Sequence, residues 1–290
     1  NIYKNVETNE GAALLFLGSG SGLGTEPAWI FESNQAGAQA GYALAGIGDI
    51  NGDLLADVLI SAPTYDFDGK TDTGMVWIFT GMDSPLGLSS IPYWSANGTQ
   101  HNELFGSAVD GAGDVNGDGY LDLIVGARGY DEDLVDIGAA YLFTNSSSGM
   151  KSAADWKVSS DQTYSGFGIS VAGLGDVNLD GFDDVAVGAH HYTDDQSLEG
   201  MVFAYRGSPI GLESTPKWTG GGNKADADFG FSIANAGDVD DDVNNDLLVG
   251  APLYKRDERI VMGQASLFMG MKAGEVMIYN TFLPMLITGQ

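Results

Sequence analysis

The stretch Asp114-Val-Asn-Gly-Asp-Gly-Tyr-Leu-Asp122 has oxygen-bearing side chains at its first, third, fifth and ninth positions. The same nine-residue pattern starts again at Asp49, Asp176 and Asp238, at intervals of 62 to 65 residues. Side chains at alternate positions of a tight loop converge on one point, and oxygens gathered there form a cage for a hard cation. Calcium suits such a cage better than magnesium, because magnesium demands octahedral geometry and keeps its waters.

The predicted ligands are the four side chains of each pattern and the backbone carbonyl of its seventh residue. They are Asp49, Asn51, Asp53, Leu55 and Asp57; Asp114, Asn116, Asp118, Tyr120 and Asp122; Asp176, Asn178, Asp180, Phe182 and Asp184; and Asp238, Asp240, Asp242, Asn244 and Asp246. This set predicts about four bound Ca²⁺ ions.

The residues that flank each loop exclude an EF-hand, which needs a Glu at its twelfth position. The twelfth residues here are Ile60, Val125, Val187 and Val249, and each lies in a short apolar run typical of a buried strand. The loops are therefore expected at the tips of β-hairpins. Acidic hairpin turns without metal are the alternative, but thirteen carboxylates among sixteen side-chain positions would repel one another.

Each repeat carries the same landmarks in the same order. An aromatic-Gly pair precedes the acidic loop, and a Gly-Ala or Ser-Ala pair, a Tyr and a Gly-initiated apolar strand follow it. These features leave room for about four short strands in each unit of about sixty residues. The sequence thus predicts an all-β protein, a β-propeller of four-stranded antiparallel blades with calcium-binding hairpin loops, with about five blades in this chain.

The landmarks resemble the FG-GAP repeat family, which includes the N-terminal β-propeller of integrin α subunits. Phe105-Gly106, the loop from Asp114 to Asp122 and Gly126-Ala127 follow the order and spacing of that family. The departures are local. Ala40 replaces the aromatic residue, Arg128 and His190 replace the proline, and Leu54 and Val243 replace the sixth-position glycine; none removes a side-chain ligand.

The predicted organisation is a single propeller over residues 1–290. It has a partial blade at 1–35, repeats at approximately 36–98, 99–160, 161–222 and 223–271, and a closing or irregular tail at 272–290. Tyr3, a Gly-initiated strand and Trp29 match the later part of the other repeats, so the chain is expected to begin in mid-blade. Both a five-bladed variant and a piece of a longer protein remain open.

Composition restricts the classes of partner. The chain has 40 acidic and 12 basic residues, which give a net charge of −28. Nucleic acid is excluded as a partner, because phosphate contacts need Lys and Arg. With no cysteine, disulfides and thiolate sites are excluded. The apolar stretch of the C-terminal tail is too short and interrupted to span a bilayer, so no direct membrane insertion is expected.

Catalytic patterns are scarce, and the chain is predicted not to be an enzyme. No cysteine nucleophile or Gly-rich phosphate loop is present, and the histidines are His101, His190 and His191. We interpret these histidines as packing or solvent-exposed residues. The tryptophans that recur once per repeat could stack on sugars, but a residue repeated at one place in successive units is more typical of packing between blades.

The face opposite the acidic loops is the variable one. Loops 63–73, 128–137, 190–199 and 252–262 follow the Gly-Ala or Ser-Ala pairs and differ in sequence between repeats, whereas the calcium face repeats. Binding residues often lie on such loops of a rigid scaffold, and the resemblance to integrins implies that this face takes the ligand. The candidate ligand-face residues are Tyr65, Tyr130, Asp131, Tyr192 and Asp194.

The sequence therefore predicts a calcium-stabilised recognition or adhesion module, extracellular or at the cell surface, that binds a protein or glycan ligand. A carbohydrate-binding or carbohydrate-cleaving propeller is one alternative, and a structural subunit of an extracellular assembly is another. Self-assembly and a larger parent protein are compatible with each of these hypotheses, since fold does not choose among functions.

Overall fold

The computed structural model describes residues 7–83, 87–257 and 260–270. The predicted tail at 272–290 and Tyr3 lie outside these residues. The described part of the chain is all-β and contains no helix. It also offers no helix with the length and apolarity needed to cross a bilayer.

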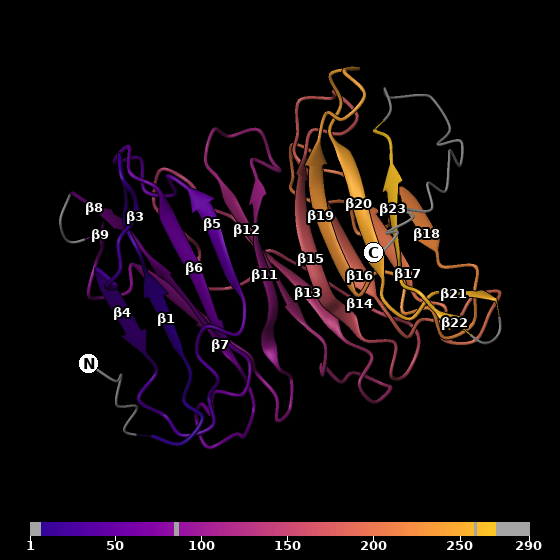
Figure 1. Ribbon diagram of the computed structural model, residues 1–290, viewed down its shortest axis with the longest axis horizontal. Coiled ribbons are helices and arrows are strands. Elements are labelled where there is room, and N and C mark those ends of the chain that lie inside the picture. The colour runs from indigo at the N-terminus through magenta and orange to yellow at the C-terminus, as the bar shows by residue number, and fades with distance from the viewer. Residues whose placement is uncertain (1–6, 84–86, 258–259, 271–290) are drawn as a thin grey trace.

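Five antiparallel sheets lie side by side in an arc, in chain order (Figure 1). We call them blades 1 to 5. Blade 1 contains β1 (Ala12–Leu15) and β4 (Trp29–Glu32); blade 2 contains β5 (Leu44–Gly48), β6 (Asp57–Ala62), β7 (Met75–Phe79) and β10 (Trp94–Asn97); blade 3 contains β11 (Phe105–Gly113), β12 (Asp122–Ala127), β13 (Ala139–Phe143) and β14 (Trp156–Ser159); blade 4 contains β15 (Phe167–Gly175), β16 (Asp184–Ala189), β17 (Met201–Tyr205) and β18 (Trp218–Gly221); blade 5 contains β19 (Ser232–Gly237), β20 (Asp246–Ala251) and β23 (Gln264–Phe268).

Blades 2, 3 and 4 are four-stranded meanders in which each strand pairs with the next along the chain. Three two-stranded hairpins extend the connections: β2 (Gly18–Ser19) with β3 (Gly22–Leu23), β8 (Gly81–Met82) with β9 (Gly87–Leu88), and β21 (Lys255–Asp257) with β22 (Ile260–Val261). The first strands of successive blades, β5, β11, β15 and β19, pack against one another. This arrangement confirms the prediction of antiparallel propeller blades.

The paired glycines of the repeat allow neighbouring blades to approach closely. A Cβ added to Gly126 of blade 3 would lie 2.0 Å from the carbonyl oxygen of Gly168 in blade 4. Gly188 of blade 4 has the same relation, at 2.1 Å, to Gly230 of blade 5. Gly168 and Gly230 have φ near +81° and +82°, which a side chain rarely allows. The Gly of each aromatic-Gly pair thus abuts the Gly-Ala pair of the preceding blade.

The recurring tryptophans join each blade to the next. The indole Nε1 of Trp94 donates a hydrogen bond to the carbonyl of Lys151 at 2.9 Å, and that of Trp156 donates to Glu213 at 3.2 Å. The same rings pack edge-on against an aromatic residue on the third strand of the following blade. These pairs are Trp29–Phe79, Trp94–Phe143, Trp156–Tyr205 and Trp218–Phe268, with ring centroids 4.9 to 5.1 Å apart. Packing between blades is therefore confirmed for the tryptophans.

Ala40, the departure from the aromatic-Gly pair, is explained by an exchange of sizes. Between blades 2 and 3, Phe105 and the small Ala96 of the preceding fourth strand belong to the same buried cluster. Between blades 1 and 2 the small residue is Ala40 and the large one is Phe31, whose ring lies 4.8 Å from that of Phe79. Volume is kept although the aromatic residue comes from the other blade.

Candidate functional site

The four acidic patterns lie between the first and second strands of blades 2 to 5. We call them acidic loops 1 (49–57), 2 (114–122), 3 (176–184) and 4 (238–246). In every loop the first Asp accepts hydrogen bonds from the backbone N–H groups of the fifth and sixth residues, at 2.7 to 3.0 Å. The fifth-position carboxylate accepts the N–H of the seventh residue. These bonds wrap the backbone around the acidic side chains.

Two positions of each loop adopt the left-handed conformation. The fourth residues have φ between +57° and +80° and the sixth between +71° and +93°. Glycine takes this conformation without strain, and Gly119 and Gly181 do so in acidic loops 2 and 3. Leu54 and Val243 hold it in acidic loops 1 and 4, with φ of 71° and 80°. A β-branched residue is the least suited to a positive φ, so Val243 stores backbone strain.

Replacing Val243 with glycine is expected to stabilise the protein by about 1 kcal/mol, because relief of strain exceeds the entropy that glycine adds to the unfolded chain. Chemical denaturation of the calcium-free protein measures this change. Val239→Gly is the matched control, since Val239 is also exposed in acidic loop 4 but has no positive φ. An unchanged or lower stability of Val243→Gly would contradict the strain.

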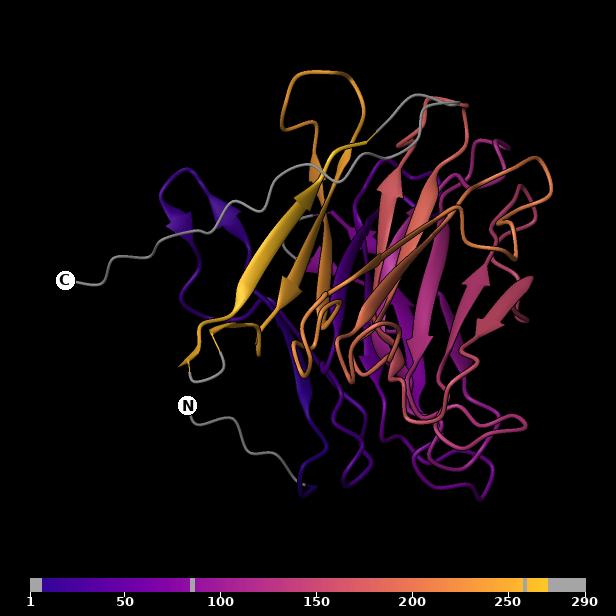
Figure 2. The ribbon, with the colours of Figure 1, turned by 90° about the vertical axis from the view of Figure 1, so that its right-hand side faces the viewer.

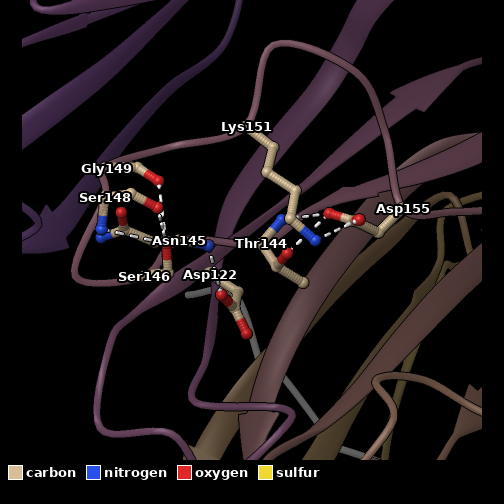
Figure 3. A network of polar contacts seen from close by, with 8 residues as sticks. All are labelled: Asp122, Thr144, Asn145, Ser146, Ser148, Gly149, Lys151 and Asp155. Atoms are coloured by element: carbon tan, nitrogen blue, oxygen red, sulfur yellow. Dashed lines mark hydrogen bonds and ion pairs between the residues drawn. The ribbon is translucent and has the colours of Figure 1, made fainter.

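The ninth Asp of each loop is a buried clamp. Asp57, Asp122, Asp184 and Asp246 are all at most 1% exposed. One oxygen accepts the N–H of the second loop residue, and the other accepts the N–H of a residue just beyond the third strand of the same blade. In blade 3 that residue is Asn145, whose N–H lies 2.8 Å from Oδ1 of Asp122 (Figure 3). The clamp closes the loop onto the blade.

Burial disfavours the charge of three of the clamps, Asp57, Asp122 and Asp184. Desolvation raises the pKa of Asp122 and of Asp184 to about 7, against the opposing effect of the backbone N–H groups, and it also raises the pKa of Asp57. In acidic loop 4, desolvation and the carboxylates of Asp242, Asp246 and Asp238 raise the pKa of Asp240. A divalent cation among these groups would offset both effects, since an opposite charge favours the ionised carboxylate.

Several buried oxygens near the loops lack a hydrogen-bond partner. They include Oδ1 of Asn178, a predicted ligand that is 3% exposed, and Oδ1 of Asn244 and of Asn145. An orphaned buried acceptor is costly in a folded protein.

Within the described residues, Asp238, Asp240 and Asp242 are the acidic group whose ligand oxygens lie within 4.8 Å of one another. An oxygen-rich site with unsatisfied acceptors fits a hard cation such as calcium.

Among the described residues, the first, third and fifth side chains come together as an acidic group in acidic loop 4, whereas the ninth Asp of every loop accepts hydrogen bonds from backbone N–H groups. Acidic loops 1 to 3 have Asn at the third position, where acidic loop 4 has Asp240. The seventh-position carbonyls and the full ligand sets stay predictions.

On the opposite face, the recurring tyrosines are packing residues. Tyr65, Tyr130 and Tyr192 each meet the central aromatic residue of the third strand of their own blade, with ring centroids 5.3 to 6.2 Å apart. Tyr130 is only 7% exposed, and its hydroxyl accepts a hydrogen bond from Lys157. Tyr130 was predicted as a ligand-face residue, which requires an exposed side chain, but its ring is buried. The acidic residues that follow Tyr130, Asp131 to Asp133, gave no sign that its ring faces the core.

The acidic candidates of this face lie nearer the solvent. Asp194 is exposed, and Asp131 is half-buried, with its carboxylate accepting the N–H of Asp136 at 2.6 Å. Desolvation lowers the pKa of the neighbouring His190 to about 4, and its ring lies against Phe231. His190 is thus a packing residue, as predicted.

Three glutamines that the sequence analysis missed hold the loops of this face. The side-chain amide of Gln100 donates to the carbonyl of Asp131 and accepts its N–H, at 2.7 and 3.0 Å. Gln35 makes the same pair of bonds with Asp66, and Gln162 makes it with Thr193. Their recurrence at intervals of 65 and 62 residues was the available signal. Each glutamine fixes the loop that follows the second strand of the next blade.

Comparison with known proteins agrees with this architecture. A profile of the FG-GAP repeat matches residues 40–79, 105–143 and 167–200, each of which contains one aromatic-Gly position, one acidic loop and one Gly-Ala or Ser-Ala pair. The chain contains three FG-GAP repeats. The repeats matched are those of blades 2, 3 and 4, in which all four strands are described.

The similar curated proteins are integrin alpha chains. The FG-GAP chain is 34% identical to integrin alpha-V of Gallus gallus over 220 residues, and 32% identical to integrin alpha-5 of Xenopus laevis over 243 residues. It is 39% identical to integrin alpha-3 of Mus musculus over 161 residues. These matches cover 73%, 78% and 53% of this chain, but only 20%, 22% and 14% of the respective relatives. The chain therefore resembles integrin alpha chains and spans about a fifth of their length.

Proposed function

We propose that this chain is a non-catalytic, calcium-stabilised recognition module, extracellular or at the cell surface, that binds a protein ligand through the face opposite the acidic loops. The observation that carries the proposal is the separation of two kinds of loop at the two ends of the same strands. In Figure 1 the loop between β19 and β20 lies at the top of the view, whereas β21 and β22 lie at the right, at the lower end of the same blade. Figure 2 shows the same separation from the side.

Calcium is the cation that best suits the acidic loops. The first and fifth carboxylates already order the loop backbone, and the buried Oδ1 of Asn178 lacks a partner. The ligand positions hold thirteen carboxylates, which repel one another without a cation. We infer that about four Ca²⁺ ions are bound with dissociation constants on the order of 10⁻⁴ to 10⁻³ M, as in extracellular modules.

The opposite face has the properties of a preorganised recognition surface. Its loops differ in sequence between blades, and Gln35, Gln100 and Gln162 tie three of them to the preceding connection. A loop held in one conformation loses less entropy when it binds a partner. Exposed carboxylates such as Asp133 and Asp194 are free to meet a basic ligand surface. The resemblance to integrin alpha chains supports adhesion as the role of this module.

Loss of Asp194 is expected to weaken ligand binding by about tenfold without a change in melting temperature, because exposed side chains contribute little to stability. The partner is first captured from the native surroundings in calcium, and binding is then titrated against purified variants. Gln162→Ala is expected to weaken binding through loss of the loop-fixing bonds to Thr193. Tyr130→Ala is unsuitable as a surface probe because its ring is buried.

Asp83→Ala is the matched control, because Asp83 is exposed in the connection that follows β8, on the side of the acidic loops. Weaker binding by Asp83→Ala, with full binding retained by Asp194→Ala and Gln162→Ala, would show that the recognition face has been assigned to the wrong end. Binding to a glycan array in place of a protein would identify a carbohydrate-binding module instead.

A further inference from the structure

The acidic loops are connected to one another across the boundaries between blades. The carbonyl of Ile50 in acidic loop 1 accepts a hydrogen bond from Nδ2 of Asn145, whose backbone N–H binds the clamp Asp122 of acidic loop 2. The carbonyl of Val115 in acidic loop 2 accepts the N–H of Ser208, next to Gly207, which binds the clamp of acidic loop 3. In blades 3 and 4, residues just beyond the third strand thus bridge their own acidic loop and the preceding one.

Acidic loops 2 and 3 share a second and more direct link. The carboxylate Oδ2 of Asp183 accepts the backbone N–H of Asp114 at 2.7 Å, and the N–H of Asp183 donates to the carbonyl of Asp114 at 3.1 Å. Asp114 is the first predicted ligand of acidic loop 2. Asp183 lies between Phe182 and Asp184, the seventh and ninth predicted ligands of acidic loop 3. This pair of bonds ties the beginning of one cation loop to the end of the next.

Asp183 occupies the eighth position of its loop, and the other loops show that a carboxylate there is not required by the fold. The eighth residues elsewhere are Ala56, Leu121 and Asn245. Leu121 packs beside Gly48, the last residue of β5 in the preceding blade, and Asn245 donates to the carbonyl of Leu174 at 2.9 Å. The position faces the preceding blade in acidic loops 2, 3 and 4, but in acidic loop 3 it adds a negative charge and a two-bond contact with the neighbouring loop.

We propose that Asp183 is a positioning residue that couples cation binding in acidic loops 2 and 3. This inference rests on the proposed binding of calcium by the acidic loops. A cation in acidic loop 3 orders the segment from Phe182 to Asp184, and the bonds of Asp183 then fix Asp114 for the cation of acidic loop 2. A site that is already ordered loses less conformational entropy on binding, so occupancy of one loop raises the affinity of the other.

Tyr120 provides a reporter for acidic loop 2 alone. It is the seventh residue of that loop, where the other loops have Leu55, Phe182 and Asn244. Tyrosine sensitises the luminescence of bound Tb³⁺, which replaces calcium at oxygen-rich sites. The part of the Tb³⁺ luminescence that Tyr120→Phe removes belongs to acidic loop 2. The decrease of this luminescence as added Ca²⁺ displaces Tb³⁺ gives the calcium affinity of that loop.

The test is a double-mutant cycle read at Tyr120. Asp180→Ala removes a ligand of acidic loop 3 and is expected to weaken Tb³⁺ binding at acidic loop 2 about fivefold when Asp183 is present. In the background Asp183→Leu, which copies Leu121, Asp180→Ala is expected to have no further effect. Asp183→Asn keeps an oxygen acceptor for the N–H of Asp114 and is expected to retain the dependence on acidic loop 3.

The control is Asp242→Ala in acidic loop 4. Because acidic loop 4 is not adjacent to acidic loop 2, this variant is expected to leave the Tyr120 signal unchanged. Equal affinity of acidic loop 2 with and without Asp180 in the wild-type background overturns the coupling, whatever the folding of Asp183→Leu. An equal effect of Asp180→Ala in both backgrounds also overturns the role of Asp183. Absence of any Tyr120-dependent signal that Ca²⁺ displaces would instead contradict the proposed calcium sites.

Discussion

Chelation of calcium is expected to lower the melting temperature of this protein by about 15 °C relative to the protein in about 10 mM calcium. A cation that binds only the folded state stabilises it by mass action, and four sites with dissociation constants of about 10⁻⁴ to 10⁻³ M together contribute about 6 to 11 kcal/mol at that concentration. The chelated protein also keeps the mutual repulsion of the loop carboxylates, such as Asp238, Asp240 and Asp242.

The measurement is a thermal melt followed by circular dichroism, in calcium, in chelator, and after calcium is restored. Magnesium at the same concentration is the ionic-strength control and is expected to recover only part of the stability, because it fits a flexible oxygen cage poorly. Asp118→Ala is expected to lower the melting temperature in calcium and to reduce the loss caused by chelation. Equal melting temperatures with and without chelator would contradict cation-stabilised loops.

Truncation of Trp156 to alanine is expected to destabilise the protein by about 3 to 5 kcal/mol, because it removes a large buried aromatic side chain. Trp156 lies on the last strand of blade 3, is 9% exposed, and packs against Tyr205 on the third strand of blade 4. Its indole also donates to the carbonyl of Glu213. The lost stability should therefore come from the contact between blades 3 and 4.

Chemical denaturation in calcium measures this effect. Trp156→Phe keeps an aromatic ring but loses the indole donor, so a smaller loss of about 1 to 2 kcal/mol is expected. Tyr42→Ala is the control for removal of an aromatic side chain from the surface, since Tyr42 is 51% exposed, and a change within about 0.5 kcal/mol is expected. A loss below about 1 kcal/mol for Trp156→Ala would contradict its role in holding the blades together.

The sequence predicted the features that repeat along the chain. The positions of Asp49 and its three counterparts placed the hairpin tips, and the recurrence of Trp94 and Trp156 indicated packing between blades. Periodic features are predictable because each blade buries the same surfaces against its neighbours. The exchange between Ala40 and Phe31 was not predictable, since it depends on two residues of different blades whose volumes compensate.

In the candidate site, too, the sequence predicted the residues whose contacts are local and missed those whose contacts depend on the folded chain. The first and fifth Asp of each acidic loop were identified from spacing alone, because their bonds lie within one turn. The burial of Tyr130 depends on Tyr141 and Lys157, which approach through strand pairing. The contact of Asp183 with Asp114 spans 69 residues and exists only after two blades have packed. Local patterns carry no information about such contacts.

The amount of calcium that the folded chain binds shows whether the acidic loops are cation sites. The purified chain is equilibrated by dialysis against about 10 mM calcium, and the excess metal bound per protein is determined by elemental analysis, with the chelated protein as reference. We expect about four Ca²⁺ ions per chain, and about three for Asp118→Ala. A protein that is folded by circular dichroism and retains no calcium above the reference would contradict calcium binding by the acidic loops.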